Sequence, residues 1–74
     1  MNSYIVTCTV ESGGVIGCLS SYALAPNKKI AIAAVELQFA RQGYVGRVPS
    51  RGQQISEIPA DCAYVNQDGR LVGG

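Results

Sequence analysis

The side chains that could carry out acid–base or nucleophilic chemistry are few in this chain and lie far apart in the sequence. Its 74 residues include three cysteines and five acidic residues but no histidine. General acid–base and nucleophilic catalysis need titratable groups that converge in one pocket, and no serine or cysteine here has an evident base. We therefore expect no catalytic residues and no cofactor, and we do not expect an enzyme.

The cysteines Cys8, Cys18 and Cys62 fit neither a metal site nor a disulfide framework. The spacing of Cys8 and Cys18 matches no zinc motif, and no histidine is available to complete a ligand set. Small secreted scaffolds usually carry an even number of cysteines, whereas this chain has an odd number. We expect three buried, reduced thiols that act as small hydrophobic groups, and no bound metal.

The sequence also lacks the features of a membrane or secreted protein. It contains no apolar run of about 18 residues, and its first residues show neither the basic nor the apolar region of a signal peptide. We therefore expect a cytoplasmic location and no membrane partner.

The cationic residues are concentrated in the middle of the chain. Between residues 27 and 54 the charged side chains are Lys28, Lys29, Arg41, Arg47 and Arg51 against the single acid Glu36. Arg47 and Arg51 lie near Tyr44 in a glycine-containing segment, where they could hold phosphates while the ring stacks on a base. The sequence pI is about 7.7, below the value above 9 typical of nucleic-acid-binding domains. Arg and Tyr are also enriched at protein–protein hot spots, so a protein partner is favoured and nucleic acid is the alternative.

The sequence predicts an N-terminal β-hairpin, which carries Cys8 and Cys18. Residues 4–10 alternate between two faces and are mostly β-branched or aromatic, which is typical of a half-buried strand. The glycines at positions 13 and 14 predict a turn, and residues 15–24 form the second strand. We expect this hairpin to open the fold.

The register of that hairpin follows from which side chains would share the apolar face. With Ser12, Gly13 and Gly14 as the loop, Cys8 lies opposite Cys18 and Tyr4 lies opposite Tyr22. A shift by one residue would place Cys8 opposite Gly17 and pack less well. The favoured register brings two thiols close together, so a Cys8–Cys18 disulfide is geometrically conceivable, although a reducing compartment opposes it.

A single helix is predicted over residues 28–42, with Asn27 as its N-cap and Gly43 just beyond its end. Its apolar residues form two stripes on opposite sides, where a surface helix of a small domain usually has one. One stripe faces the sheet, and the other is covered either by residues 44–54 or by a protein partner, such as a second copy in a homodimer. The first stripe contains Ile30, Ala33, Ala34, Leu37 and Ala40, and the second contains Ile32, Val35 and Phe39.

The C-terminal third gives weaker signals. Residues 44–48 predict a short strand, 50–54 a loop and 55–58 an edge segment. A terminal hairpin is expected from Cys62–Val65 and Arg70–Val72, which flank a turn containing Asp-Gly. The whole chain, 1–74, is then one small α+β domain of order β-β-α-β-β, with the helix packed on a mainly antiparallel sheet.

The last residues are Arg70-Leu71-Val72-Gly73-Gly74. A β-β-α-β-β order that ends in Gly-Gly resembles the ubiquitin-like (β-grasp) sulfur carriers of thiamin and molybdopterin synthesis. The resemblance implies that Gly74 would be activated as a thiocarboxylate and that Gly73 would give access to the activating enzyme. It covers the two terminal residues and the coarse element order.

The composition favours a different function. The chain is 47% hydrophobic and 15% charged, although a small domain has proportionally more surface to cover with polar groups. This balance predicts a non-catalytic protein-binding module whose apolar surface a partner covers. Short chains of this kind resemble accessory and inhibitory proteins of phages and mobile elements, including anti-CRISPR proteins, which act by occupying a surface of a larger complex. The predicted protein-binding residues are Ile32, Val35, Phe39, Arg41, Tyr44, Arg47 and Arg51.

Overall fold

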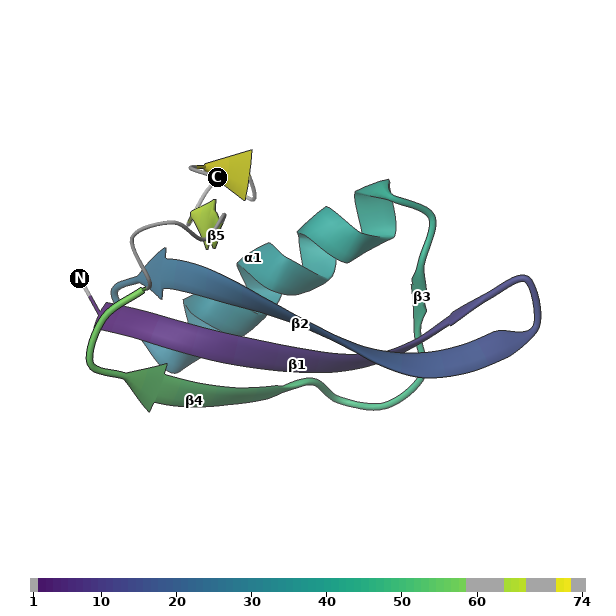
Figure 1. Ribbon diagram of the computed structural model, residues 1–74, viewed down its shortest axis with the longest axis horizontal. Helices are drawn as coiled ribbons and strands as arrows, with labels where there is room; N and C mark the ends of the chain where they lie inside the picture. Colours follow the sequence, from purple (N-terminus) through teal and green to yellow (C-terminus); the bar gives the residue numbers. More distant parts are fainter. Residues whose placement is uncertain (1, 59–63, 67–70, 73–74) are drawn as a thin grey trace.

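A computed structural model describes residues 2–58, 64–66 and 71–72 of the chain. They form two long strands, one helix and four short strands (Figure 1). The elements are β1 (Asn2–Ser12), β2 (Val15–Ala25), α1 (Lys28–Arg41), β3 (Val45–Gly46), β4 (Arg51–Ile55), β5 (Tyr64–Asn66) and β6 (Leu71–Val72). The helix packs on one face of a largely antiparallel sheet, so the α+β class and the coarse β-β-α-β-β order are confirmed.

The β1–β2 hairpin is the longest part of the sheet, and it closes through two glycines. Gly13 and Gly14 have φ angles of 59° and 83°, the left-handed backbone that a two-residue hairpin loop requires. Ser12 therefore pairs directly with Val15. Each earlier residue of β1 pairs with the corresponding later residue of β2, as far as Asn2 and Ala25.

The predicted register of the hairpin is wrong by one residue. The three-residue loop assumed for it would have placed Cys8 opposite Cys18, but Cys8 pairs with Leu19, and Cys18 pairs with Thr9. The physical reason is that a two-residue loop with both residues in left-handed conformation matches the twist of the strands. Because side chains alternate along a strand, Cys8 points to the helix side of the sheet and Cys18 to the opposite side. The expected burial is therefore confirmed for Cys8 and wrong for Cys18, which is exposed.

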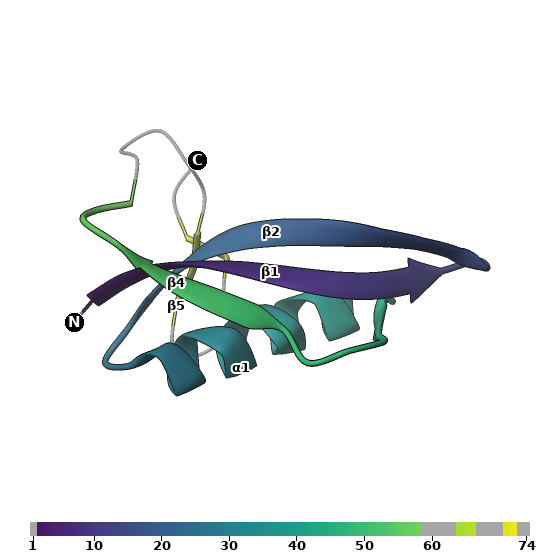
Figure 2. The ribbon, with the colours of Figure 1, turned by 90° about the horizontal axis from the view of Figure 1, so that it is seen from below.

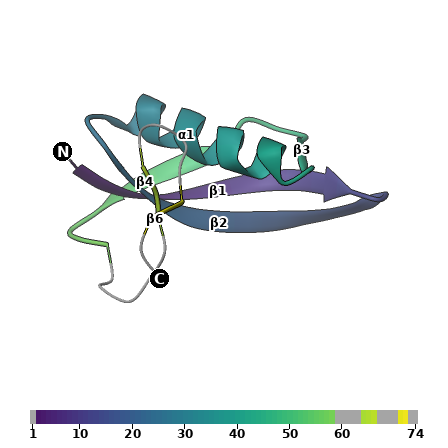
Figure 3. The same ribbon diagram turned by 90° about the horizontal axis from the view of Figure 1, so that it is seen from above.

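The helix forms where the sequence predicts it. The side chain of Asn27 accepts a hydrogen bond of 3.0 Å from the amide of Ile30, and Gly43 follows the helix with a φ of 93°. Figures 2 and 3 show α1 lying along one side of the sheet. Its small buried residues Ala31 and Ala34 allow the helix to approach closely, and Val35 is fully buried between the two layers.

The core of the domain lies between α1 and the inner face of the hairpin. Alternate residues of β1 contribute larger side chains to it, whereas β2 contributes small ones. Leu19, Ile32, Phe39 and Tyr44 pack around its edge. The buried cluster consists of Tyr4, Val6, Cys8, Val10, Ala23, Ala25, Ala31, Ala34 and Val35.

The segment after the helix returns along the side of β1 that faces away from β2. β3 pairs with Val10 and Glu11, and β4 runs antiparallel to β1 from Ser3 to Thr7. The predicted strand over residues 44–48 is therefore confirmed for its centre, whereas the loop predicted over 50–54 is instead strand β4. The pattern of β4 was hidden because this edge strand is largely exposed and carries polar residues rather than apolar ones. Of the edge segment expected at 55–58, only Ile55 belongs to a strand.

The C-terminal strands join the other edge of the sheet. β5 runs parallel to β2 along Tyr22–Leu24, and β6 pairs antiparallel with β5. The expected terminal hairpin is thus present, while most of its turn and Cys62 lie outside the described residues. The sheet order is β3-β1-β2-β5-β6, with β4 also paired to β1.

Gly52 of β4 lies directly beneath the first turns of the helix. A Cβ placed on it would be 3.0 Å from Cγ of Lys28 and 3.1 Å from Cγ1 of Ile32, closer than side chains normally pack. We expect Gly52→Val to lower the free energy of unfolding by about 1 to 3 kcal/mol, because the added atoms push α1 away from the sheet. Urea denaturation measures this change.

Gly46→Val is the matched control, because a Cβ on Gly46 meets no atom within 4 Å. Equal stabilities for the two variants would contradict the close contact between β4 and α1.

Candidate functional site

The two apolar stripes of the helix have opposite environments. The stripe predicted to face a partner lies against the sheet, since Val35 is fully buried and Ile32 and Phe39 are half-buried beside the core. The other stripe is mostly exposed, and Leu37 retains 44% of its surface. The assignment of the stripes is therefore reversed, because the small inner side chains of β2 leave room for the bulkier stripe, Ile32, Val35 and Phe39.

Residues 44–52 run along the flank of the helix. The rings of Tyr44 and Phe39 meet edge to face, with their centroids 6.2 Å apart. Further along, the Ser50 hydroxyl donates a 2.7 Å hydrogen bond to Oε2 of Glu36. The alternative in which this segment lies against the helix therefore accounts for Phe39 without a partner.

A small cavity between this segment and the helix contains a buried thiol. It has a volume of about 230 Å³ and is lined by Cys8, Val10, Glu36, Phe39, Ala40, Tyr44, Gly46 and Ser50. The Ser50 hydroxyl lies 3.2 Å from Sγ of Cys8 and also bonds Glu36. Burial raises the pKa of the Cys8 thiol, the Ser50 hydrogen bond opposes this change, and the negative charge of Glu36 adds to it. Cys8 therefore stays protonated near neutral pH and is a poor nucleophile.

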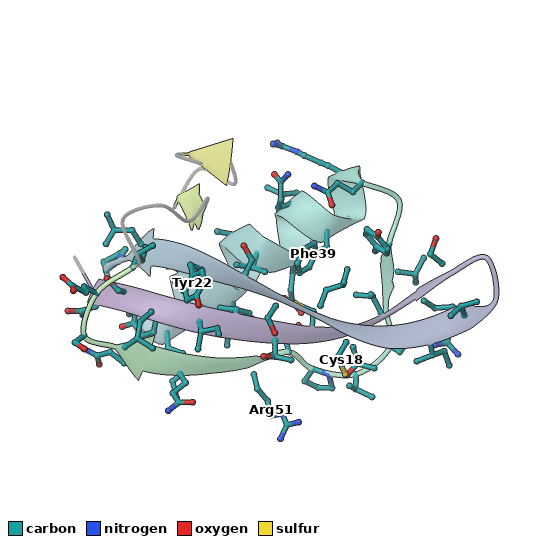
Figure 4. The ribbon with its side chains drawn as sticks, viewed as in Figure 1. Cys18, Tyr22, Phe39 and Arg51 are labelled. Carbon is teal, nitrogen blue, oxygen red and sulfur yellow. The ribbon has the colours of Figure 1, made fainter. Side chains whose placement is uncertain are left out.

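The face of the sheet away from α1 is not covered by any element in the described part of the chain. Its hairpin rows pair Ile5 with Tyr22, Thr7 with Ser20, and Thr9 with Cys18. Figure 4 shows how Tyr22, Cys18 and Arg51 lie on the sheet, with Phe39 on the helix. β4 extends two of these rows, since Gln53 pairs with Ile5 and Arg51 pairs with Thr7. We call the surface formed by Ile5, Thr7, Thr9, Glu11, Ile16, Cys18, Ser20, Tyr22, Val45, Arg51 and Gln53 the open face.

The open face is mostly uncharged and is hollowed on the β4 side. The hollow has a volume of about 410 Å³ and is lined by Ile5, Thr7, Arg51, Gly52 and Gln53. Cross-strand hydroxyl groups satisfy each other nearby, with 3.0 Å between Oγ1 of Thr7 and Oγ of Ser20. At the far end, Ile16 and Val45 flank Glu11 and retain 60% and 57% of their surface. A protein surface could bury these side chains with little cost in desolvated charge.

The predicted cationic and aromatic residues do not form one cluster. Arg47 forms a 3.4 Å ion pair with Glu11, and Arg51 belongs to the hollow of the open face. Arg41 ends the helix, while Tyr44 packs on Phe39. Of the predicted site, only Arg47 and Arg51 therefore lie near the open face.

Sequence reasoning missed the apolar members of the open face, Ile5, Ile16, Tyr22 and Val45. In residues 4–10 the face that carries Ile5 also carries Thr7 and Thr9, so Ile5 was the one apolar signal from that strand for a second covered face.

No family model, curated protein or solved structure matches this chain. Within residues 2–58 and the two short C-terminal strands, no three potential metal ligands gather at one place. No described helix is long and apolar enough to cross a membrane. Function is therefore inferred from the surface chemistry of the fold.

The raised pKa of Cys8 predicts a pH dependence of stability. In the unfolded chain the thiol ionises near its ordinary pKa of about 8.5, whereas the folded protein holds the proton to higher pH. Proton binding then favours the folded state, so the stabilisation by Cys8 falls as pH rises above about 8.5. We expect the stability difference between the wild type and Cys8→Ala to shrink between pH 8 and pH 10, measured by urea denaturation.

Cys18→Ala provides the control, because it removes an exposed thiol and keeps the buried thiol of Cys8. A wild-type profile parallel to that of Cys8→Ala would contradict the buried, protonated thiol.

Proposed function

We propose that this chain is a non-catalytic protein-binding module and that its open face is the docking surface. The observation that carries the proposal is the uneven covering of the sheet, because α1 covers one face while the other presents apolar and neutral polar side chains to solvent. Sheets in small domains commonly bury one face and solvate the other with clearly polar residues. Here the solvated face keeps Ile5, Ile16, Tyr22 and Val45 instead.

The chemistry of the open face supports a protein partner with an acidic group. Interface cores are poor in Lys, Glu and Asp and rich in Tyr and Arg, and the open face has this character through Tyr22 and Arg51. Arg51 lies at the hollow together with Thr7 and Gln53, where a guanidinium can bind a carboxylate with two parallel hydrogen bonds. The expected partner therefore has an apolar surface with an Asp or Glu positioned to reach Arg51.

Such a module would act by occupying the partner's surface rather than by chemistry. This mode of action fits an inhibitor or accessory protein, the anti-CRISPR-like function expected from the sequence. Nucleic acid is less compatible with the open face, since Arg47 is already paired with Glu11 and tight binding of phosphates needs several free cations. The carrier alternative depends on Gly73 and Gly74, which lie outside the described residues.

The proposal predicts that charge reversal on the open face abolishes binding of a partner protein. The wild-type chain, Arg51→Glu and Tyr22→Ala would each be immobilised and used to capture proteins from the native host, followed by mass spectrometry. We expect one protein to be recovered by the wild type and lost, at least tenfold, from both variants. Calorimetry with that purified protein should give the same loss of affinity.

Arg41→Glu is the matched control, because it makes the same charge change at the end of the helix and away from the open face. A partner lost equally from Arg41→Glu and Arg51→Glu would contradict docking on the open face. A partner lost only on deletion of Gly73 and Gly74 would support the carrier function instead, and a salt-dependent gel shift lost in Arg51→Ala would support nucleic acid.

A further inference from the structure

The outer edge of β2 carries backbone groups with no partner among the described residues. Ser12 and Val15 close a two-residue hairpin, so their backbone groups bond to each other. In an antiparallel pair every second residue bonds to the partner strand, so Gly17, Leu19 and Ser21 also bond to β1. Ile16, Cys18 and Ser20 therefore direct their N–H and C=O groups away from β1. β5 pairs with β2 along Tyr22–Leu24, so among the described residues nothing pairs with the outer edge from Val15 to Ser21, which we call the free edge.

The free edge lacks the features that normally prevent strands from pairing. Natural proteins protect exposed edges with charges, prolines or covering elements, but Val15-Ile-Gly-Cys-Leu-Ser-Ser21 has no charge and no proline. Val15 and Ile16 retain 73% and 60% of their surface. The edge formed by β4, in contrast, carries Arg51 and lies against Lys28 of the helix.

We propose that the free edge pairs with the same edge of a second copy of this chain, in an antiparallel, two-fold symmetric dimer. Full overlap of the two free edges places Cys18 opposite Cys18 of the second copy, and Ile16 opposite Ser20. All three are residues whose backbone groups point outward, so this register satisfies every free N–H and C=O between Val15 and Ser21. Because the edge is uncharged, no like charges meet across the two-fold axis.

Side-chain shape supports the same register. On the helix side of the sheet, Leu19 of one copy lies opposite Gly17 of the other. A hollow of about 170 Å³ is lined there by Val10, Ser12, Val15, Gly17, Cys18, Leu19 and Tyr44. A Cβ on Gly17 would meet no atom within 4 Å, so the space above this glycine is open to Leu19 of the second copy. An added strand whose alternate side chains fill such hollows is a recurrent mode of recognition.

The dimer leaves the open face uncovered, because strands added at an edge extend a sheet without covering its faces. This inference therefore does not rest on the proposed function. The dimer joins the two open faces side by side in one larger surface.

Light scattering tests the inference directly. The wild-type chain should have a mass of twice 7.8 kDa, and Ser20→Pro should reduce it to 7.8 kDa. Proline at position 20 removes an outward N–H but no bond to β1, so circular dichroism should show that the fold is kept. Gln54→Pro is the matched control, since its N–H points outward from the opposite edge, and it should remain dimeric.

Gly17→Val is a second variant that should also be monomeric, because its side chain occupies the space left for Leu19 of the second copy, while its Cβ meets no atom of its own chain within 4 Å. In a Cys62→Ser background, a short bismaleimide should link two chains through Cys18, whose paired Cα atoms lie about 5.5 Å apart in this register. The link should disappear in Cys18→Ala. A mass of 7.8 kDa at every concentration, or a dimer unaffected by Ser20→Pro and Gly17→Val, would overturn the proposal.

Discussion

The left-handed conformation of Gly13 and Gly14 is the constraint on which the rest of the structure depends. It closes the hairpin in two residues and so pairs Ser12 with Val15. Because side chains alternate along a strand, this single choice determines which residues of β2 face the helix. Ala23, Ala25 and Leu19 point inward, whereas Ile16, Cys18 and Tyr22 point to the open face.

The packing of the helix follows from that register. Small side chains on the inner face of β2 leave space for Val35 and for the half-buried Ile32 and Phe39, and Gly52 lets α1 approach β4. The same register directs the backbone groups of Ile16, Cys18 and Ser20 to the free edge. The core, the open face and the free edge are therefore three consequences of one turn.

Local signals in the sequence were sufficient to predict the helix and the coarse order of the elements. Asn27 and Gly43 are strong helix boundaries, and the alternation of residues 4–10 identifies a strand without any knowledge of its neighbours. The register was missed because it depends on whether Ser12 belongs to the loop, a choice that differs by one residue and reverses every side chain of β2. β4 was missed because its residues are ordered by pairing with β1 rather than by burial of their own side chains.

The candidate site was harder to predict because it also depends on contacts between elements that are far apart in the sequence. Which of two apolar helix stripes faces the sheet depends on the sizes of side chains across the interface, and that information is not present in the helix itself. Arg51 could be chosen from the sequence as a candidate binding residue, but its neighbours Ile5 and Thr7 belong to a strand far from it in the sequence.

The most direct test of the account is the register of the hairpin, measured by nuclear Overhauser effects between Hα protons. Residues in non-hydrogen-bonded antiparallel pairs bring these protons close together. The observed register predicts strong contacts between Hα of Thr9 and Cys18 and between Hα of Thr7 and Ser20. A strong Hα contact between Cys8 and Cys18 would instead show a register shifted by one residue, and it would contradict both the open face and the free edge.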